Sequence, residues 1–145
     1  MKKKIGFACD HAGYQTKEFL VGYLDARGYE VIDYGCYSEE SIDYPDFAHQ
    51  LAKGIEGGEV ELGVGLCGSG EGMAMTLNKH QGIRAGLCWC SEVARLIKVH
   101  NNANVIVLPA RFVDYDQAIE MVDAWLSSTF EGGRHQTRID KMTVK

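Results

Sequence analysis

The sequence predicts an α/β fold in which a five-stranded parallel sheet is covered by helices on both faces. Two observations carry this prediction: strands and helices alternate along the chain, and the strands are short, continuous apolar runs. The chain has 145 residues, the size of one ordinary domain, and no repeat or break in composition divides it. We therefore expect a single domain over residues 1–145.

The first half of the chain contains three predicted strands. They are expected at residues 4–9, 30–34 and 62–66. Between the first two, apolar residues recur at helical spacing, and Gly28 follows as a stop signal. Pro45 suits the first turn of a second helix, which leads into the third strand.

The second half continues the alternation with two more strands. A short helix is expected at 72–79, followed by a strand at 83–89. Ser91 is expected to cap the next helix, and a purely aliphatic strand follows at 105–108. Asp114 starts another amphipathic helix, and the polar tail after it is compatible with one more. Since ligands of parallel sheets bind beyond the carboxyl ends of the strands, chemistry is expected there.

Bulk composition excludes several classes of protein. The net charge is −5, so no general nucleic-acid surface is expected. No apolar run approaches the ~20 residues of a membrane span, and the N-terminus lacks the pattern of a signal peptide, so a cytoplasmic protein is expected. The five cysteines include no CxxC pair and are expected as reduced thiols, with Cys88 and Cys90 sharing one face of a strand.

Glycine is the unusual residue, and five of the 17 lie between positions 63 and 72. The segment fits GxGxxG, but Ile83 stands where a dinucleotide site has its ribose-binding acid. Glu71-Gly72 replaces the Lys-Ser/Thr of a P-loop, and Met73 replaces the arginine of a cysteine phosphatase. A nucleotide-binding oxidoreductase therefore stays a weak alternative.

The loop from Cys67 to Gly72 indicates an anion cradle. Its alternating glycines let a ligand approach backbone N–H groups, and the loop opens a helix, whose N-terminus attracts negative charge. A thiol at that position is a usable base or nucleophile. The alternative is a tight turn around a buried cysteine.

Three other groups of residues are candidates for chemistry. Asp10-His11 ends the first strand and suits acid–base work or phosphate binding, although a helix cap with a surface histidine has the same appearance. His100 begins an asparagine-rich turn and could act as an acid or base, but the same residues are also typical of a turn without a chemical role. Arg134 and Arg138 would share one helix face, as a phosphate clamp or as a solvated basic surface.

Taken together, these segments resemble the B-type ribose-5-phosphate isomerase family, which also contains allose-6-phosphate and galactose-6-phosphate isomerases. The resemblance runs nearly end to end, in order and in spacing. It is carried by residues 5–13, 43–46, 67–73, 78–79, 82–85, 94–95, 100–104 and 133–135.

The resemblance implies a Rossmann-like three-layer αβα sandwich and an aldose–ketose isomerase that needs no metal and no cofactor. It also implies a homodimer, or a dimer of such dimers, with active sites at the subunit interface. The expected substrate is ribose 5-phosphate, which would place the enzyme in the pentose phosphate pathway. Isomerisation of a hexose 6-phosphate, or sugar-phosphate binding without catalysis, stays open as an alternative.

The resemblance also assigns roles to individual residues. By family role, Cys67 moves a proton between C1 and C2, and His100 opens the sugar ring with Asn101 beside it. Asp10 and Tyr44 would contact the sugar. The developing oxyanion would be held by the loop residues Gly68, Ser69, Gly70, Glu71 and Gly72, and the phosphate by His11, Arg111, Arg134 and Arg138. Ser69 stands where threonine is more frequent and Pro109 where glycine is, which leaves the placement of Arg111 to be tested.

Overall fold

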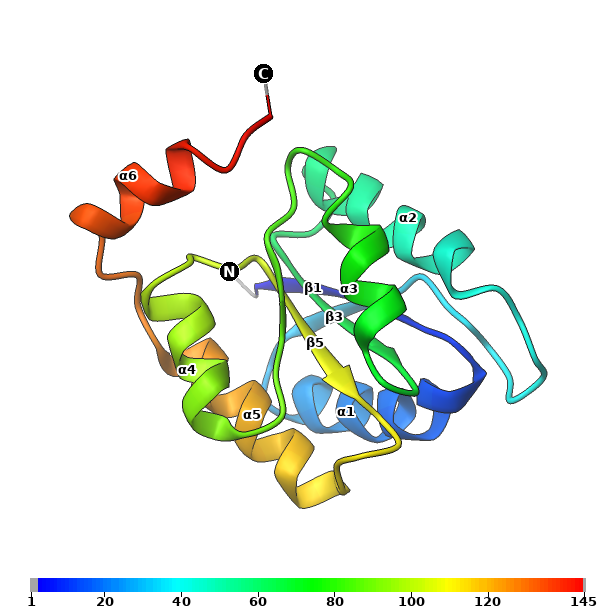
Figure 1. The fold of residues 1–145 in the computed structure, drawn as a ribbon. Coiled ribbons are helices and arrows are strands. Elements are labelled where there is room, and N and C mark those ends of the chain that lie inside the picture. The colour runs from blue at the N-terminus through cyan, green and yellow to red at the C-terminus, as the bar shows by residue number, and fades with distance from the viewer. Residues whose placement is uncertain (1–2, 145) are drawn as a thin grey trace.

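The computed structural model describes residues 3–144 and contains one five-stranded sheet between two layers of helices (Figure 1). The strands are β1 (Lys4–Cys9), β2 (Glu30–Asp33), β3 (Leu62–Cys67), β4 (Ala85–Leu87) and β5 (Val105–Pro109). All neighbouring pairs are parallel, in the order β2-β1-β3-β5-β4. The predicted α/β class and the five-stranded parallel sheet are confirmed.

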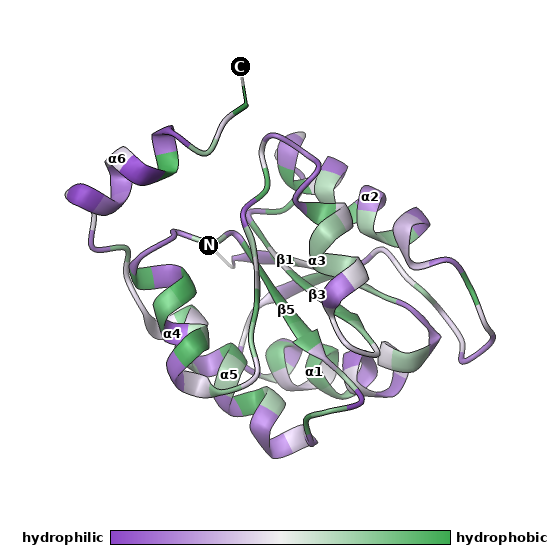
Figure 2. Ribbon diagram, viewed as in Figure 1, coloured by the Kyte–Doolittle hydropathy of each residue, from purple (hydrophilic) through white to green (hydrophobic). Residues whose placement is uncertain are grey.

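The helices lie on both faces of this sheet, as predicted. They are α1 (Tyr14–Ala26), α2 (Tyr44–Glu56), α3 (Glu71–Leu77), α4 (Ser91–Val99), α5 (Tyr115–Ser127) and α6 (Arg134–Asp140), with a short 3₁₀ turn η1 (His11–Gly13) before α1. Helices α1, α4 and α5 bury their apolar sides in one core cluster, and α2 and α3 in another. Helix α6 extends from the rest of the chain and is mostly polar (Figures 1 and 2).

The strands are apolar on both sides because each side faces a helical layer. In β5, Ile106 and Leu108 pack with α1, α4 and α5, whereas Val105 and Val107 pack with α2 and α3. This alternation follows from the two-residue period of a strand, and it explains why the strands read as continuous apolar runs. Figure 2 shows the hydrophobic strands at the centre of the molecule.

Two details differ from the sequence-based expectations. The fourth strand, β4, is only three residues long, and it lies at the edge of the sheet, where it pairs with β5 alone. Ser91 is not the cap of α4: it is the first helical residue, and Cys90 is the N-cap, without a side-chain capping bond. Asp114 does cap α5, and its carboxylate accepts from the Gln117 N–H at 2.7 Å.

The polarity of the sheet decides where each loop lies. Because all five strands are parallel, the segments that follow them emerge at one edge, the carboxyl edge, and the segments that precede them lie at the opposite, amino edge. Helices α1 and α3, which follow the adjacent strands β1 and β3, cover opposite faces. The carboxyl ends of β1 and β3 are therefore the place where sheets of this kind bind ligands.

Candidate active site

Asp10 and Cys67 lie side by side at the carboxyl ends of β1 and β3. Cys9 of β1 pairs with Leu66 of β3, so the next residue of each strand lies side by side, and the Asp10 N–H donates to the Leu66 carbonyl at 3.1 Å. The Asp10 carboxylate accepts from the Gly13 N–H at 3.1 Å, which fixes its orientation. Both side chains are largely buried, Asp10 at 8% exposed and Cys67 at 5%. A thiol and an oriented carboxylate thus share the end of the two central strands.

The glycine-rich loop turns the chain directly from Cys67 into α3. Gly70 has a φ of +81°, a conformation that favours glycine, and it is the N-cap of the helix. The Ser69 hydroxyl accepts from the Glu71 N–H at 3.3 Å. At Gly72 a side chain would overlap the ring of Tyr44, so glycine is required for the two to approach. The loop therefore turns tightly from Cys67 into the first turn of α3.

Three further predicted residues lie at the same edge. Tyr44 is the first residue of α2 and packs over the loop at Gly72. His11 follows Asp10, and its Nδ1 accepts from the Ile42 N–H at 3.4 Å. Arg111 follows β5, and its N–H donates to the Gly68 carbonyl at 3.0 Å. The guanidinium crosses Gly68 so closely that a Cβ there would lie 3.2 Å from Nη1, which places Arg111 next to the loop.

The other four predicted residues lie at the amino edge of the sheet. His100 is the C-cap of α4, and Asn101 follows it in the turn that leads into β5. Arg134 and Arg138 are exposed on α6. Both arginines are in one helix, as predicted.

Arg84 fixes the shape of the turn that carries His100, a role that the sequence did not indicate. Its Nε donates to the Asn101 carbonyl at 3.0 Å, and its Nη2 donates to the Asn102 carbonyl at 3.0 Å. Asn102 has a φ of +46°, consistent with the left-handed geometry expected of asparagine in this turn. Hydrogen bonds from Arg84, the residue before β4, thus hold the turn before β5 in its conformation.

Within one chain, His100 and Cys67 are too far apart to act on one small substrate. Gly63 pairs with Val105, and Cys67 pairs with Pro109, so four steps of strand separate the two edges. At about 3.3 Å per residue this is about 13 Å. An acid or base acts within hydrogen-bond reach, about 3 Å. His100, which precedes β5, therefore cannot act as an acid or base beside the Cys67 of its own chain.

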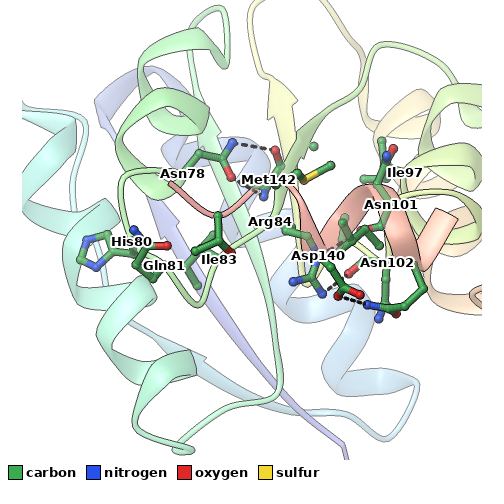
Figure 3. Close-up of a pocket in the computed structure, with 16 residues that line it drawn as sticks. Asn78, His80, Gln81, Ile83, Arg84, Ile97, Asn101, Asn102, Asp140 and Met142 are labelled. Atoms are coloured by element: carbon green, nitrogen blue, oxygen red, sulfur yellow. Dashed lines mark hydrogen bonds between the residues drawn. The ribbon is translucent and has the colours of Figure 1, made fainter. Parts of the chain in front are cut away.

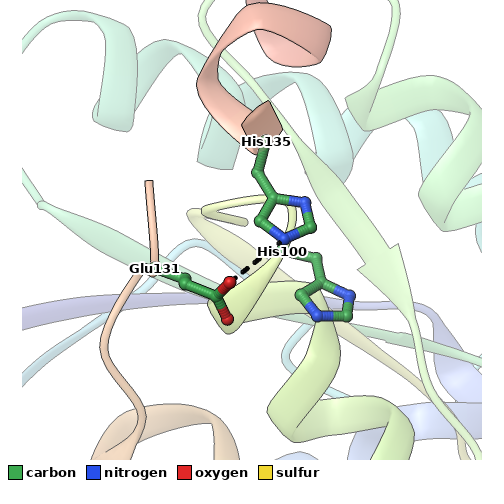
Figure 4. A group of neighbouring side chains, drawn as sticks. All are labelled: His100, Glu131 and His135. Atoms are coloured by element: carbon green, nitrogen blue, oxygen red, sulfur yellow. Dashed lines mark ion pairs between the residues drawn. The ribbon is translucent and has the colours of Figure 1, made fainter. Parts of the chain in front are cut away.

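His100 stacks on His135, which the sequence analysis did not single out as a functional residue (Figure 4). The ring centroids are 4.3 Å apart and the planes differ by 16°. His135 is buried, and Glu131 Oε1 lies 3.6 Å from its Nε2. Burial, with smaller effects from His100 and Arg134, lowers the pKa of His135. This imidazole therefore stays neutral down to a lower pH than a free histidine does.

A cleft of about 690 Å³ opens between the C-terminal segment and the body of the chain (Figure 3). Its walls include Asn78, Arg84, Asn101, Asp140 and Met142. Of the residues predicted for the site, only Asn101 lines it. Met142 is 54% exposed although it is a large apolar residue, so this cleft is a surface with unburied hydrophobic area.

The remaining four cysteines are all free, and they differ in burial. Cys88 and Cys90 were predicted to share a strand face, but β4 ends at Leu87, and Cys88 is buried while Cys90 is exposed. Burial raises the pKa of Cys88 to about 12. Cys9 and Cys36 are buried with their Sγ atoms 3.7 Å apart, and burial raises the pKa of Cys9. All five cysteines are free thiols, as predicted.

A buried charge near these thiols was also missed. The Lys17 side chain is fully buried, and its Nζ donates to Asp33 Oδ2 and to the Cys36 carbonyl, both at 2.6 Å. The signal was present in the helical spacing, because Lys17 precedes the buried Leu20 and Leu24 by three and seven residues.

None of the helices within residues 3–144 has the length and hydrophobicity to span a bilayer.

Known proteins resemble this chain along almost its whole length. A family model described as Ribose/Galactose Isomerase matches residues 5–142. Ribose-5-phosphate isomerase B of Escherichia coli K12 is 45% identical over 142 residues, which cover 98% of this chain and 95% of that protein. A ribose 5-phosphate isomerase structure from Thermotoga maritima has a TM-score of 0.96 and 46% identity, with 98% of each chain covered.

A second solved structure adds information about a ligand. It is the ribose-5-phosphate isomerase B of Mycoplasma genitalium with bound ribulose-5-phosphate. That structure is 40% identical, has a TM-score of 0.92, and covers 98% of this chain and 95% of its own. The similarity includes the strands and loops that carry the residues of both edges.

Proposed function

The chain belongs to the ribose/galactose isomerase family, and from that premise we propose that it interconverts ribose 5-phosphate and ribulose 5-phosphate. The observation that carries this proposal is the end-to-end similarity to ribose-5-phosphate isomerases, one of them with bound ribulose-5-phosphate. Such an enzyme is an aldose–ketose isomerase of the pentose phosphate pathway, for which the cytoplasm is the expected compartment.

Cys67 is the base in this proposal. Its thiolate removes the proton from C2 of the open aldose; the electron pair of that bond forms the C1–C2 double bond, and the carbonyl pair moves to O1. Return of the proton from the thiol to C1, with transfer of the O2 proton to O1, gives the ketose and regenerates the thiolate. The location of Cys67 at the carboxyl end of β3, beside the oriented Asp10 carboxylate, supports this assignment.

The glycine-rich loop holds the negative charge that develops on O1. Backbone N–H groups that are already oriented stabilise an oxyanion without having to reorganise, and this is often the largest contribution to such a reaction. The loop from Gly68 to Gly72 is held by Tyr44 and Arg111, which contact it from two sides. Asp10 and Tyr44 contact the sugar hydroxyls in this arrangement.

We propose further that the working enzyme is a homodimer in which each site uses two chains. One chain supplies Cys67, its loop, Asp10, His11, Tyr44 and Arg111, and the partner supplies His100, Asn101, Arg134 and Arg138. The separation of about 13 Å between the two ends of the strands, one beside Cys67 and the other beside the turn of His100, supports this division. The half-exposed Met142 in the cleft beside the projecting α6 supports a second chain at this surface.

His100 of the partner opens the sugar ring by moving a proton between O1 and the ring oxygen. The phosphate, bound by His11 and the arginines, fixes the remote end of the substrate, and this binding energy holds C1 and C2 beside Cys67.

The direct test of the proposed function is a panel of aldose phosphates, read by ketose formation. Ribose 5-phosphate is expected to give the highest kcat/KM. Allose 6-phosphate or galactose 6-phosphate as the preferred substrate would replace the pentose assignment within the same chemistry. Binding without turnover of any of them would make the protein a sugar-phosphate binder.

Replacing Arg138 with alanine is expected to weaken substrate binding without removing the chemistry. A guanidinium–phosphate pair contributes about 1.5–3 kcal/mol, so KM should rise about tenfold or more while kcat changes little. Steady-state kinetics with ribose 5-phosphate measure both values. Arg27→Ala is the matched control, because Arg27 is an exposed arginine at the end of α1 and should leave KM unchanged. A fall in kcat with unchanged KM would argue against phosphate binding by Arg138.

A further inference from the structure

Three side chains with metal-binding atoms converge beside the amino edge of the sheet. They are His100, Glu131 and His135, and their ligand atoms all lie within 4.8 Å of one another (Figure 4). Imidazole nitrogen and carboxylate oxygen are ligands that Zn²⁺ prefers, and two histidines with one glutamate form a frequent three-ligand zinc set. The three side chains therefore offer the types of ligand atom that zinc sites use.

The backbone builds this cluster. The Glu131 N–H donates to the Val99 carbonyl at 3.0 Å, which holds Glu131 beside the end of α4, where His100 is the next residue. Gly132 and Gly133 then turn the chain with φ values of +77° and +60°, and His135 lies in the first turn of α6. Three segments are thus fixed relative to one another by backbone geometry.

His135 supplies the second observation that points to a ligand. It is 6% exposed, and within residues 3–144 its Nε2 has no hydrogen-bond partner. A buried polar nitrogen without a partner is unfavourable, and a bound cation would remove that cost.

We propose that His100, Glu131 and His135 form an inhibitory binding site for Zn²⁺ or a similar divalent transition-metal ion. Tetrahedral coordination at about 2.0–2.2 Å places ligand atoms roughly 3.3 Å apart, so the side chains must close in from their present spacing. Glu131 is 54% exposed and free to rotate, and the stacked His100 ring must turn out of its parallel arrangement. Water completes the fourth position.

Nearby charges limit the affinity of this site. Arg134 and Arg138 lie on the same helix as His135 and disfavour a cation, whereas Glu131 contributes the negative charge of the ligand set. The ion is therefore expected to bind reversibly and to be removed by a chelator. A histidine that ligates a metal has no free lone pair for proton transfer, so the inhibitory effect rests on the proposed role of His100 in ring opening.

Metal binding is tested first without substrate, so that its outcome does not depend on the proposed isomerase activity. Zn²⁺ is titrated into the full chain by calorimetry, and Co²⁺ is titrated with its visible absorption as a report of nitrogen and oxygen coordination. One ion per chain is expected. Glu131→Gln and His135→Asn should each weaken binding by at least about tenfold.

His80→Asn is the matched control, since His80 belongs to another histidine cluster with His49 and Glu56. It should bind Zn²⁺ as the unaltered chain does. The site would be overturned by unchanged affinity in both Glu131→Gln and His135→Asn, or by loss of binding in His80→Asn alone. If replacing the buried His135 unfolds the chain, Glu131→Gln alone still tests the site.

The inhibitory effect is then measured with ribose 5-phosphate. Zn²⁺ should slow ketose formation over the same concentration range as it binds, and excess chelator should restore the rate. Glu131→Gln should need at least about tenfold more Zn²⁺ for the same inhibition. Saturation of the site with full activity retained would contradict the inhibitory role.

Discussion

Replacing Cys67 with alanine is expected to lower kcat for ribose 5-phosphate by about 10³-fold, because general acid–base groups contribute about 10²–10⁴-fold to such reactions. The oxyanion loop and the phosphate-binding residues remain, so binding of the sugar phosphate should change by only a few-fold. Ketose formation measures the first quantity, and calorimetry with ribose 5-phosphate measures the second. Together they separate the loss of a base from the loss of a binding site.

Cys90→Ala is the matched control for this variant. Cys90 is an exposed free thiol, so its removal should leave both kcat and binding unchanged. Full activity of Cys67→Ala would refute the assignment of the base, and the search would turn to the Asp10 carboxylate, the other acid–base group at the carboxyl ends of β1 and β3. Loss of binding together with activity would instead indicate that Cys67 serves the structure of the loop.

Replacing His100 with alanine is expected to lower kcat/KM for ribose 5-phosphate by about 10²-fold or more. The effect should depend on whether the substrate is cyclic. The 4-deoxy analogue of ribose 5-phosphate cannot close a ring, because O4 is absent and O5 carries the phosphate, yet it keeps the five-carbon chain. In His100→Ala the kcat/KM for this open analogue should stay within a few-fold of the unaltered enzyme.

The comparison of the two substrates is what decides the role of His100. An equal loss for the cyclic sugar and for the open analogue would mean that His100 takes part in proton transfer at C1 and C2 or in binding, and not in ring opening. Gln136→Ala provides a control on the neighbouring helix, since Gln136 is exposed and bonded to Asp140. It should leave both substrates unaffected.

Most of the fold could be predicted because the relevant information is local. Each strand is a short apolar run, and helices α1 and α5 carry recognisable end signals in Gly28 and in the capping Asp114. The errors occur where tertiary contacts decide. Strand β4 is shorter than its apolar sequence indicates, since only Ala85, Gly86 and Leu87 pair with β5. Serine often caps helices, but α4 begins at Ser91 itself, so the N-cap is Cys90.

The residues around Cys67 were predictable for a similar reason. Asp10 follows β1 and Cys67 ends β3, and the parallel topology brings the ends of these strands together, whereas Arg111 was expected only from the family resemblance. What the sequence could not show are pairings between distant segments. The stack of His135 on His100, the bond from Glu131 to Val99 and the bracing of the turn by Arg84 have no local pattern. Active sites at a subunit interface were expected from the family resemblance, and the structure adds that His100 and Cys67 lie at opposite edges of the sheet within one chain.

The central claim is that each active site combines Cys67 of one chain with His100 of another. The most direct test is a hybrid dimer of one Cys67→Ala chain and one His100→Ala chain, isolated through a different affinity tag on each. One of its two sites then contains an unaltered Cys67 and an unaltered His100, whereas the other lacks both. The hybrid is expected to have about half the activity of the unaltered dimer, as twofold symmetry requires, although each parent variant is nearly inactive. A hybrid as inactive as its parents would show that the two residues act within one chain and would contradict the shared site.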